Sequence, residues 1–226
     1  MDSSGPTRQI VIPGESVGGR GLKPGPGTFS DGGQIYAAHL GVVDERDGLV
    51  SVVPLAGRYI PQPGDAVVGE IVDLGASHWL VDINSPYPAP LHATESPWHV
   101  EFGDTRRYLN VGDVLLCHVL SVDEANRVQL TMQDREARRV QGGQLLEIEP
   151  MKVPRVIGRQ GSMISLIKEG TRCGVYVGQN GRIWLDGRDE DIALAVRAIK
   201  LVEQRAQAVG LTELVKDFLS RARRGG

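Results

Sequence analysis

The sequence has few cysteines and no long apolar run. Its two cysteines, Cys117 and Cys173, belong to no CxxC or Cys/His pair, which argues against a disulfide framework and a structural zinc site. No segment approaches the roughly 20 consecutive apolar residues that span a bilayer. Residues 1–5 lack the charged start and apolar run of a secretory signal. We therefore expect a cytoplasmic protein that does not bind membranes.

Patterns of catalytic and metal-binding residues are also missing. The 5 histidines show no HxH or HExxH spacing, and single histidines on strands and loops pack or face solvent more often than they bind metal. A Mg²⁺ site is conceivable at Asp186, Asp189 and Asp191, but the positive end of a helix also accounts for this acidic cluster. Cys173 has no base nearby in the sequence. We expect no catalytic residue, no metal and no cofactor, and thus a protein that is not an enzyme.

Glycine and proline are abundant, and charge is unevenly distributed. Together 29 Gly and 13 Pro make 42 of 226 residues, above the usual share of about 12%, which indicates many turns and small modules. Residues 151–226 carry 14 Lys and Arg against 8 Asp and Glu, a balance of +6, whereas residues 1–150 carry 11 against 20, a balance of -9. The basic last third suggests an anionic partner, although a solvated helical face fits the charge about as well.

Turn-forming segments interrupt the first part of the chain. Short β-prone runs lie between them, and no regular helix is expected before residue 34. We interpret residues 1–62 as a small antiparallel β domain with long loops, and the stiff Pro61-Gln62-Pro63-Gly64 segment as its boundary. The turn-forming segments are Pro13-Gly14, Gly18-Gly19-Arg20-Gly21, Pro24-Gly25-Pro26-Gly27 and Gly32-Gly33.

Residues 63–143 contain five β-type segments. In the last one Val128, Leu130 and Met132 alternate with polar residues, which is the period-two pattern of a strand with one wet face. Five short strands separated by turns predict a small closed barrel of the OB type. The expected strands cover residues 65–73, 79–84, 89–93, 113–122 and 127–132.

Helical periodicity begins only after Gly142-Gly143. The elements expected from there on have the order β-α-α-β-β-α around a GxxG, which is typical of a type I KH domain, an α+β fold. A further amphipathic helix is expected over residues 212–223. The chain is thus predicted to be multidomain, β-rich in its N-terminal and central parts, with a KH domain and a C-terminal helix over residues 144–226. The expected KH elements cover residues 144–149, 153–157, 162–168, 173–177, 182–186 and, as a long helix, 189–206.

The GxxG of this region is Gly158-Arg159-Gln160-Gly161. Of three GxxG matches it is the one that opens directly onto a helix, whereas Gly18–Gly21 lies in a loop and Gly178–Gly181 between two strands. Glycines let the backbone approach a sugar-phosphate chain, the first N–H groups of the helix attract phosphate, and Arg159 adds positive charge. A tight helix-turn-helix is the alternative reading of an isolated GxxG.

The sequence resembles the RNA-binding cap subunits of the archaeal exosome. The resemblance covers about residues 8–205, nearly the whole chain. Its most specific parts are the run around residues 82–87 combined with residues 180–184. The residues that carry it are Gly69-Glu70-Ile71-Val72-Asp73, Trp79-Leu80-Val81-Asp82-Ile83-Asn84-Ser85-Pro86-Tyr87-Pro88-Ala89, Arg106-Arg107-Tyr108-Leu109-Asn110-Val111-Gly112-Asp113, Ile157 to Gly161 and Gly178-Gln179-Asn180-Gly181-Arg182-Ile183-Trp184-Leu185.

This resemblance implies three modules: an N-terminal β domain, a central OB-fold domain of the S1 type and a KH domain. In that family three cap subunits sit on a hexameric ring of RNase PH-like, phosphorolytic subunits. The N-terminal domain makes much of the ring contact, and the central domains surround the pore through which single-stranded RNA enters. The cap binds RNA and does not cut it.

Four further residues are candidate RNA contacts. The resemblance matches Arg106 and Arg107 to the pore-facing loop, where they would guide phosphates; a solvated charge pair is the alternative. Trp79 and Tyr87 can stack on bases, with core packing or turn support as the alternative. Residues 63–143 carry 6 basic and 12 acidic residues, so we expect weak, sequence-tolerant binding by the isolated chain.

Two other functions compete with that of a cap subunit. A free RNA-binding factor in translation or ribosome maturation would need no ring partner. A ribonuclease would shorten RNA by itself.

Overall fold

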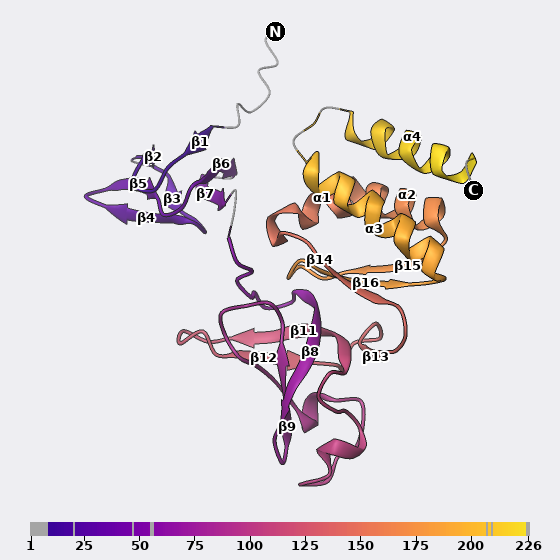
Figure 1. The fold of residues 1–226 in the computed structure, drawn as a ribbon. Coiled ribbons are helices and arrows are strands. Elements are labelled where there is room, and N and C mark those ends of the chain that lie inside the picture. Colours follow the sequence, from indigo (N-terminus) through magenta and orange to yellow (C-terminus); the bar gives the residue numbers. More distant parts are fainter. Residues whose placement is uncertain are drawn as a thin grey trace. The chain divides into compact units, whose positions relative to one another are not determined.

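A computed structural model describes residues 9–19, 21–46, 48–54, 57–206, 208 and 210–224 (Figure 1). The chain forms two compact units, Met1–Gly57 and Arg58–Gly226. The division precedes the boundary expected after residue 62 because Tyr59 packs into the core of the barrel and its hydroxyl donates to Asp65 at 2.7 Å. None of the helices in the described part of the chain is long and apolar enough to cross a membrane.

The N-terminal unit consists of short strands in two sheets. One sheet has the order β1-β6-β7-β3 and the other β2-β5-β4. The core of the unit is small, with Val11, Ala37 and Val52 at its centre. Gly27 has a φ of +74°, and a Cβ there would collide with the carbonyl of Val52, so the close approach of these segments requires glycine. The strands are β1 (Ile10–Val11), β2 (Ser16–Gly18), β3 (Lys23–Pro24), β4 (Thr28–Asp31), β5 (Gln34–Ala37), β6 (Gly41–Arg46) and β7 (Leu49–Pro54).

The first part of the second unit is a closed five-stranded barrel. Its sheet has the order β12-β10-β9-β8-β11-β13, and β12 also pairs with β11, which closes the ring of strands. Inward-facing apolar side chains fill the barrel, among them Trp79, Leu91, Leu115 and Leu130, all 0% exposed. The predicted OB-type barrel is confirmed. Its five strands are β8 (Ala66–Leu74), β9 (His78–Asp82), β10 (Ala89–His92), β11 (Val114–Val122) and β12 (Val128–Thr131). A sixth strand, β13 (Arg138–Val140), was not expected and pairs with β11 outside the ring.

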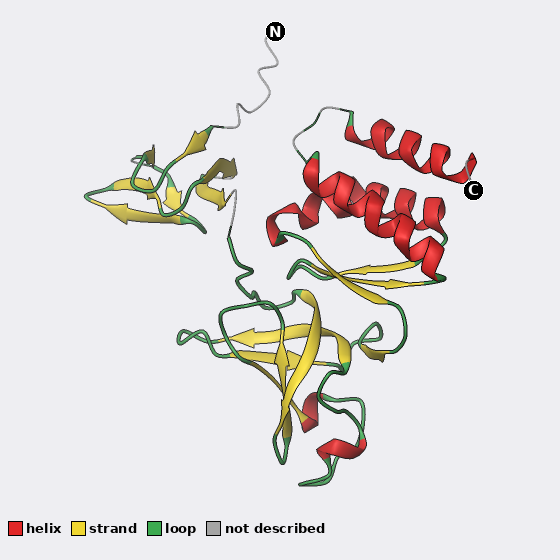
Figure 2. Ribbon diagram, in the orientation of Figure 1, coloured by secondary structure: helices red, strands yellow, loops and turns green. Residues whose placement is uncertain are grey.

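The KH domain follows the barrel directly. Its three strands form an antiparallel sheet in the order β14-β16-β15, and Figure 2 shows the helices packed on one face of that sheet. The observed order β-α-α-β-β-α confirms the predicted fold. The elements are β14 (Gln144–Glu147), α1 (Val153–Ile157), α2 (Ser162–Thr171), β15 (Gly174–Val177), β16 (Arg182–Asp186) and α3 (Asp189–Gln204).

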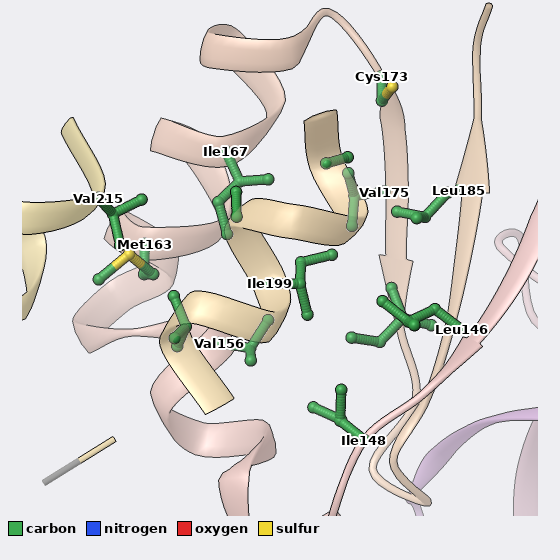
Figure 3. Packing of buried hydrophobic residues seen from close by; sticks show 14 of the residues in the cluster. Leu146, Ile148, Val156, Met163, Ile167, Cys173, Val175, Leu185, Ile199 and Val215 are labelled. Carbon is green, nitrogen blue, oxygen red and sulfur yellow. The ribbon is translucent and has the colours of Figure 1, made fainter. Parts of the chain in front are cut away.

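The core of the KH domain lies between the sheet and the helices (Figure 3). Val156, Ile167 and Ile199 point into it from three helices, and Leu185 meets them from the sheet; all four are 0% exposed. Helix α4 (Leu211–Arg224) extends this core with Val215, also 0% exposed. The apolar stripes at spacings of three and four residues, which predicted α3 and α4, are therefore the faces that pack.

Candidate nucleic-acid interface

The GxxG loop joins α1 to α2 and requires unusual backbone geometry. Gly158 has φ 74° and ψ 173°, while Gln160 (φ 50°) and Gly161 (φ 77°) adopt left-handed conformations. A Cβ on Gly158 would lie 2.7 Å from the backbone nitrogen of Met163. The turn itself therefore demands glycine at 158, whether or not the loop binds a ligand. At Gly161 the nearest atom, Cγ2 of Ile164, is 3.8 Å away, so only the backbone conformation favours glycine there.

The two central residues of this loop face solvent. Arg159 and Gln160 are exposed, and Gly158 and Gly161 are half-buried. Helix α2 starts directly after the loop with no acidic residue in its first turn and no side-chain hydrogen bond capping its start. Free N–H groups at a helix start attract anions, and Arg159 adds a cation beside them. The loop thus has the exposure, charge and donors that phosphate binding requires.

The second GxxG of the domain, Gly178–Gly181, has the opposite environment. It forms the turn between β15 and β16 and is pressed against β8 of the barrel: the N–H of Gln179 donates to the carbonyl of Ala66 at 2.8 Å. A Cβ on Gly178 would lie 2.8 Å from the backbone nitrogen of Val68. This turn connects the KH domain to the barrel and leaves no room for a nucleic acid.

Asn180 holds that turn in place. Its side chain is 0% exposed; its amide nitrogen donates to the carbonyls of Val68 at 2.7 Å and Ile83 at 3.0 Å. The amide oxygen accepts from the N–H of Val68 at 3.3 Å. In return, the side chain of Asn84 donates to the carbonyl of Asn180 at 3.0 Å. The two stretches that made the resemblance specific therefore contact each other, and their role here is to join two domains.

Arg182 makes a second polar link between barrel and KH domain. Its guanidinium is bonded to the carboxylates of Asp82 at 2.6 Å and Glu147 at 2.9 Å. Partial burial pushes the pKa of Asp82 upward, but hydrogen bonds from Arg182 and the Asn84 N–H, together with the charge of Arg182, outweigh it and hold that pKa below its usual value. Trp184 packs beside this link with Val68 and Leu116 of the barrel.

The predicted arginines lie in what we term the arginine loop, residues 96–108, between β10 and β11. A 3-10 helix, Thr105–Arg107, places both side chains in solvent. Arg107 is paired with Asp104 at 2.7 Å, whereas Arg106 has no ion pair within the described part of the chain. Arg106 is therefore the freer of the two to bind a phosphate.

Trp79 does not fit its predicted role. Its ring is 0% exposed in the barrel core, and its Nε1–H donates to the carbonyl of Thr105 at 3.2 Å. A ring without an open face cannot stack on a base. Trp79 therefore packs in the barrel core and does not contact RNA as predicted. The alternating pattern of β9 made the side chain point inward, and its polar tip supports the arginine loop.

Tyr87 lies half-buried against the barrel core. The turn before it is closed by Ser85, whose hydroxyl donates to the carbonyl of Tyr87 at 2.8 Å and accepts from its N–H at 3.2 Å. Base stacking by the exposed part of this ring stays a prediction.

The acidic and cysteine side chains have local roles. No group of three or more His, Cys, Asp or Glu side chains among the described residues is placed to hold a metal ion. Asp189 and Asp191 lie in the first turn of α3, where Asp191 pairs with Arg188 at 2.7 Å. Burial raises the pKa of the Cys117 thiol to about 12 and also raises that of Cys173, so both thiols stay protonated at neutral pH.

Comparison with known proteins gives consistent matches along the chain. Residues 8–56 match the model of the exosome RNA binding protein RRP4 N-terminal domain, residues 58–121 that of the RRP4 S1 domain, and residues 143–191 that of a KH domain. The exosome complex component Rrp4 of Picrophilus torridus is 42% identical over 218 residues, which are 96% of this chain and 95% of the relative. The chain belongs to the Rrp4 family of exosome components.

Other Rrp4 relatives and a solved structure agree with this assignment. The Rrp4 of Methanosarcina barkeri is 41% identical over 216 residues, or 96% of this chain and 83% of the relative. A crystal structure described as an exosome complex RNA-binding protein superposes with a TM-score of 0.68 at 39% identity, covering 74% of this chain and 98% of the other. The resemblance stated from the sequence is thus confirmed, including the order of N-terminal, S1 and KH domains.

Proposed function

We propose that this Rrp4 family member is a non-catalytic cap subunit that captures single-stranded RNA and delivers it to a phosphorolytic RNase ring. The observation that carries the proposal is the exposed GxxG loop at the uncapped start of α2. Arg159 in the loop and Arg155 on α1 are both exposed, so cations and backbone donors meet there. Such contacts grip a sugar-phosphate backbone without reading the bases, which suits a subunit that accepts many RNAs.

Delivery requires a docking surface, and the N-terminal unit supports this part of the proposal. Large apolar side chains remain open to solvent in a unit of only 57 residues. When such side chains form one contiguous patch, they are typical of a protein interaction site. We propose that this unit contacts the hexameric ring of RNase PH-like subunits, with three caps per ring in the cytoplasm. Those at least 40% exposed are Ile10, Ile12, Phe29, Leu40 and Leu49.

The arginine loop would guide the strand towards the ring. Arg106 is the cation best placed for this, since Arg107 is occupied by Asp104. Backbone amides and arginines bind and orient phosphates but supply no general base at pH 7. Cleavage is therefore assigned to the ring.

The proposal is tested by RNA binding and reconstitution with the full chain. Arg159→Asp combined with Gln160→Asp should weaken binding of a labelled single-stranded oligonucleotide at least tenfold, because carboxylates repel phosphate. Asp tolerates the left-handed backbone at position 160. The control is Arg221→Asp, a charge reversal of an exposed arginine on α4. Unchanged affinity in the double variant would overturn the role of the GxxG loop.

Ring docking and the absence of cleavage need separate measurements. The chain should bring down RNase PH-like subunits in stoichiometric amounts from native lysate and leave RNA intact when incubated alone. Failure to bind such subunits would favour a free factor in translation or ribosome maturation. Shortening of RNA by the purified chain would show that it is a nuclease.

A further inference from the structure

Phe102 is the most exposed large apolar side chain in the described part of the protein. It is 85% exposed, and the next most exposed, Ile10 and Ile12, reach 61%. Phenylalanine is among the residues most often buried. An exposure this large on a barrel with a complete core of its own therefore calls for a physical explanation.

The backbone fixes Phe102 at the tip of a tight turn. The N–H of Asp104 donates to the carbonyl of Glu101 at 3.0 Å, and Gly103 has a φ of 92°. Phe102 is thus the second residue of a type II turn whose third residue must be glycine. The N–H of Gly103 donates in turn to the carbonyl of Ala76 at 2.8 Å, which ties the tip to the turn between β8 and β9.

The base of the arginine loop is equally well anchored. The hydroxyl of Thr105 donates to the carbonyl of Gly75 at 2.8 Å, and buried Trp79 donates to the carbonyl of Thr105. The hydroxyl of Tyr108 donates to the carbonyl of His99 at 2.7 Å. A side chain on such a fixed loop loses little backbone entropy when a ligand binds. In the sequence Phe102 is only an aromatic residue before a glycine. Its exposure to solvent is a property of the folded loop.

The loop that carries Phe102 also carries cations. Arg106 and Arg107 follow on the same loop in the 3-10 helix Thr105–Arg107, and Figure 2 shows two short helices in red at one end of the barrel. This end is distant from the KH contact: Asn180 binds near the start of β8 and Thr105 after its end, about 20 Å apart along the strand.

The charged residues near Phe102 in the loop indicate which kind of partner binds there. Protein docking sites are contiguous apolar patches, but the neighbours of Phe102 along the loop are the charged residues Glu101, Asp104 and Arg106, and the carboxylate of Asp104 is neutralised by Arg107. An exposed aromatic face and an arginine without an ion pair on the same loop are instead the combination that binds single strands, because every base has a face to stack and every nucleotide a phosphate.

We propose that Phe102 is a stacking platform for one base of single-stranded RNA, with Arg106 bound to a neighbouring phosphate. The inference rests on the proposed function and adds a second contact point to the GxxG loop. Binding of a base at Phe102 does not depend on which base it is, because stacking requires only an aromatic face.

The test uses the full chain and a 5'-labelled single-stranded oligoadenylate, titrated at several salt concentrations. Phe102→Ala should lower affinity about fivefold to a hundredfold and leave the salt dependence unchanged, since no phosphate contact is lost. Phe102→Trp should restore binding, and its added indole fluorescence should be quenched by the stacked base. Phe102→Leu should not restore it. Val111→Ala, at a site 60% exposed in the same domain, is the control and should bind normally.

Other outcomes overturn the proposal in distinguishable ways. If Phe102→Ala binds normally while Arg159→Asp/Gln160→Asp loses affinity, the platform is refuted and the proposed function stands. If leucine restores what alanine loses, the contact is merely apolar and a protein-like interaction replaces stacking. If neither Arg159→Asp/Gln160→Asp in the GxxG loop nor the Phe102 variants change the affinity for RNA, the proposed RNA-binding function itself fails.

Discussion

The side chain of Asn180 contacts the backbone of Val68 in both directions, donating to its carbonyl at 2.7 Å and accepting from its N–H at 3.3 Å. The two residues are 112 positions apart in the chain. A side-chain amide thus replaces a missing strand neighbour and satisfies backbone groups that the barrel leaves open at this point. It joins the KH domain to the barrel.

We expect Asn180→Ala to destabilise the protein by about 2–4 kcal/mol, because it leaves two buried carbonyls and one N–H of the barrel without partners. Urea unfolding followed by tryptophan fluorescence measures this, since Trp184 lies in the contact. Gln179→Ala is the control: the Gln179 side chain is exposed and its link to the barrel is made by the backbone. Equal stability of the two variants would contradict the role of Asn180.

The Arg182–Asp82 pair predicts acid sensitivity of the same contact. The pKa of Asp82 is lowered in the folded state, so the stability it contributes is present above its ordinary value of about 4 and is lost as pH falls through the folded value. Asp82→Asn should therefore be less stable than the wild type at pH 7, and the difference should shrink below about pH 4. Urea titrations at several pH values measure it. A difference in stability between Asp82→Asn and the wild type that stays constant down to pH 2 would contradict this account. Glu124→Gln, at an exposed turn, serves as the control.

The two glycines of the GxxG loop should differ in their tolerance of a side chain. Gly158→Ala combines an unfavourable backbone region with a collision against Met163 and should cost at least about 2 kcal/mol. Gly161→Ala would make only an ordinary contact with Ile164 and should cost only about 1 kcal/mol. Thermal unfolding of both variants gives the comparison. Equal loss at both positions would show that backbone conformation alone matters. Because Gly158→Ala also destabilises the loop, a loss of RNA binding in this variant would not by itself show that Gly158 contacts RNA.

The two arginines should contribute unequally to RNA binding. Arg106→Ala should reduce the slope of log affinity against log salt by about 0.7, the value for one phosphate contact on a single strand. Arg107→Ala should change it less, since this side chain is already paired with Asp104. Salt titrations of both variants with single-stranded RNA decide the point. A larger change for Arg107 would mean that RNA displaces Asp104.

The barrel and the KH domain were predictable because their signals are local. Turn residues and apolar periodicity placed β16 at residues 182–186 and α1 at residues 153–157, as observed. The choice of Gly158–Gly161 among the GxxG matches came from the helix that follows it; Arg159 and Gln160 of this loop face solvent, whereas Gly178 and Asn180 of a second match are buried. Strand β13 was missed because its three residues carry no alternating pattern of their own and pair with β11 only in the folded barrel.

The sequence by itself determined the three modules and the loop that can meet a phosphate backbone, because glycine, helix starts and alternation act within a few residues of the chain. The tertiary structure decided which side chains are free to use. It buried Trp79, gave Asn180 and Arg182 to the contact between barrel and KH domain, and left Phe102 in solvent. The contacts of Asn180 and Arg182 with the barrel join residues about a hundred positions apart, and Trp79 meets Thr105 of a loop that follows the next strand, so these pairings arise only when the chain has folded.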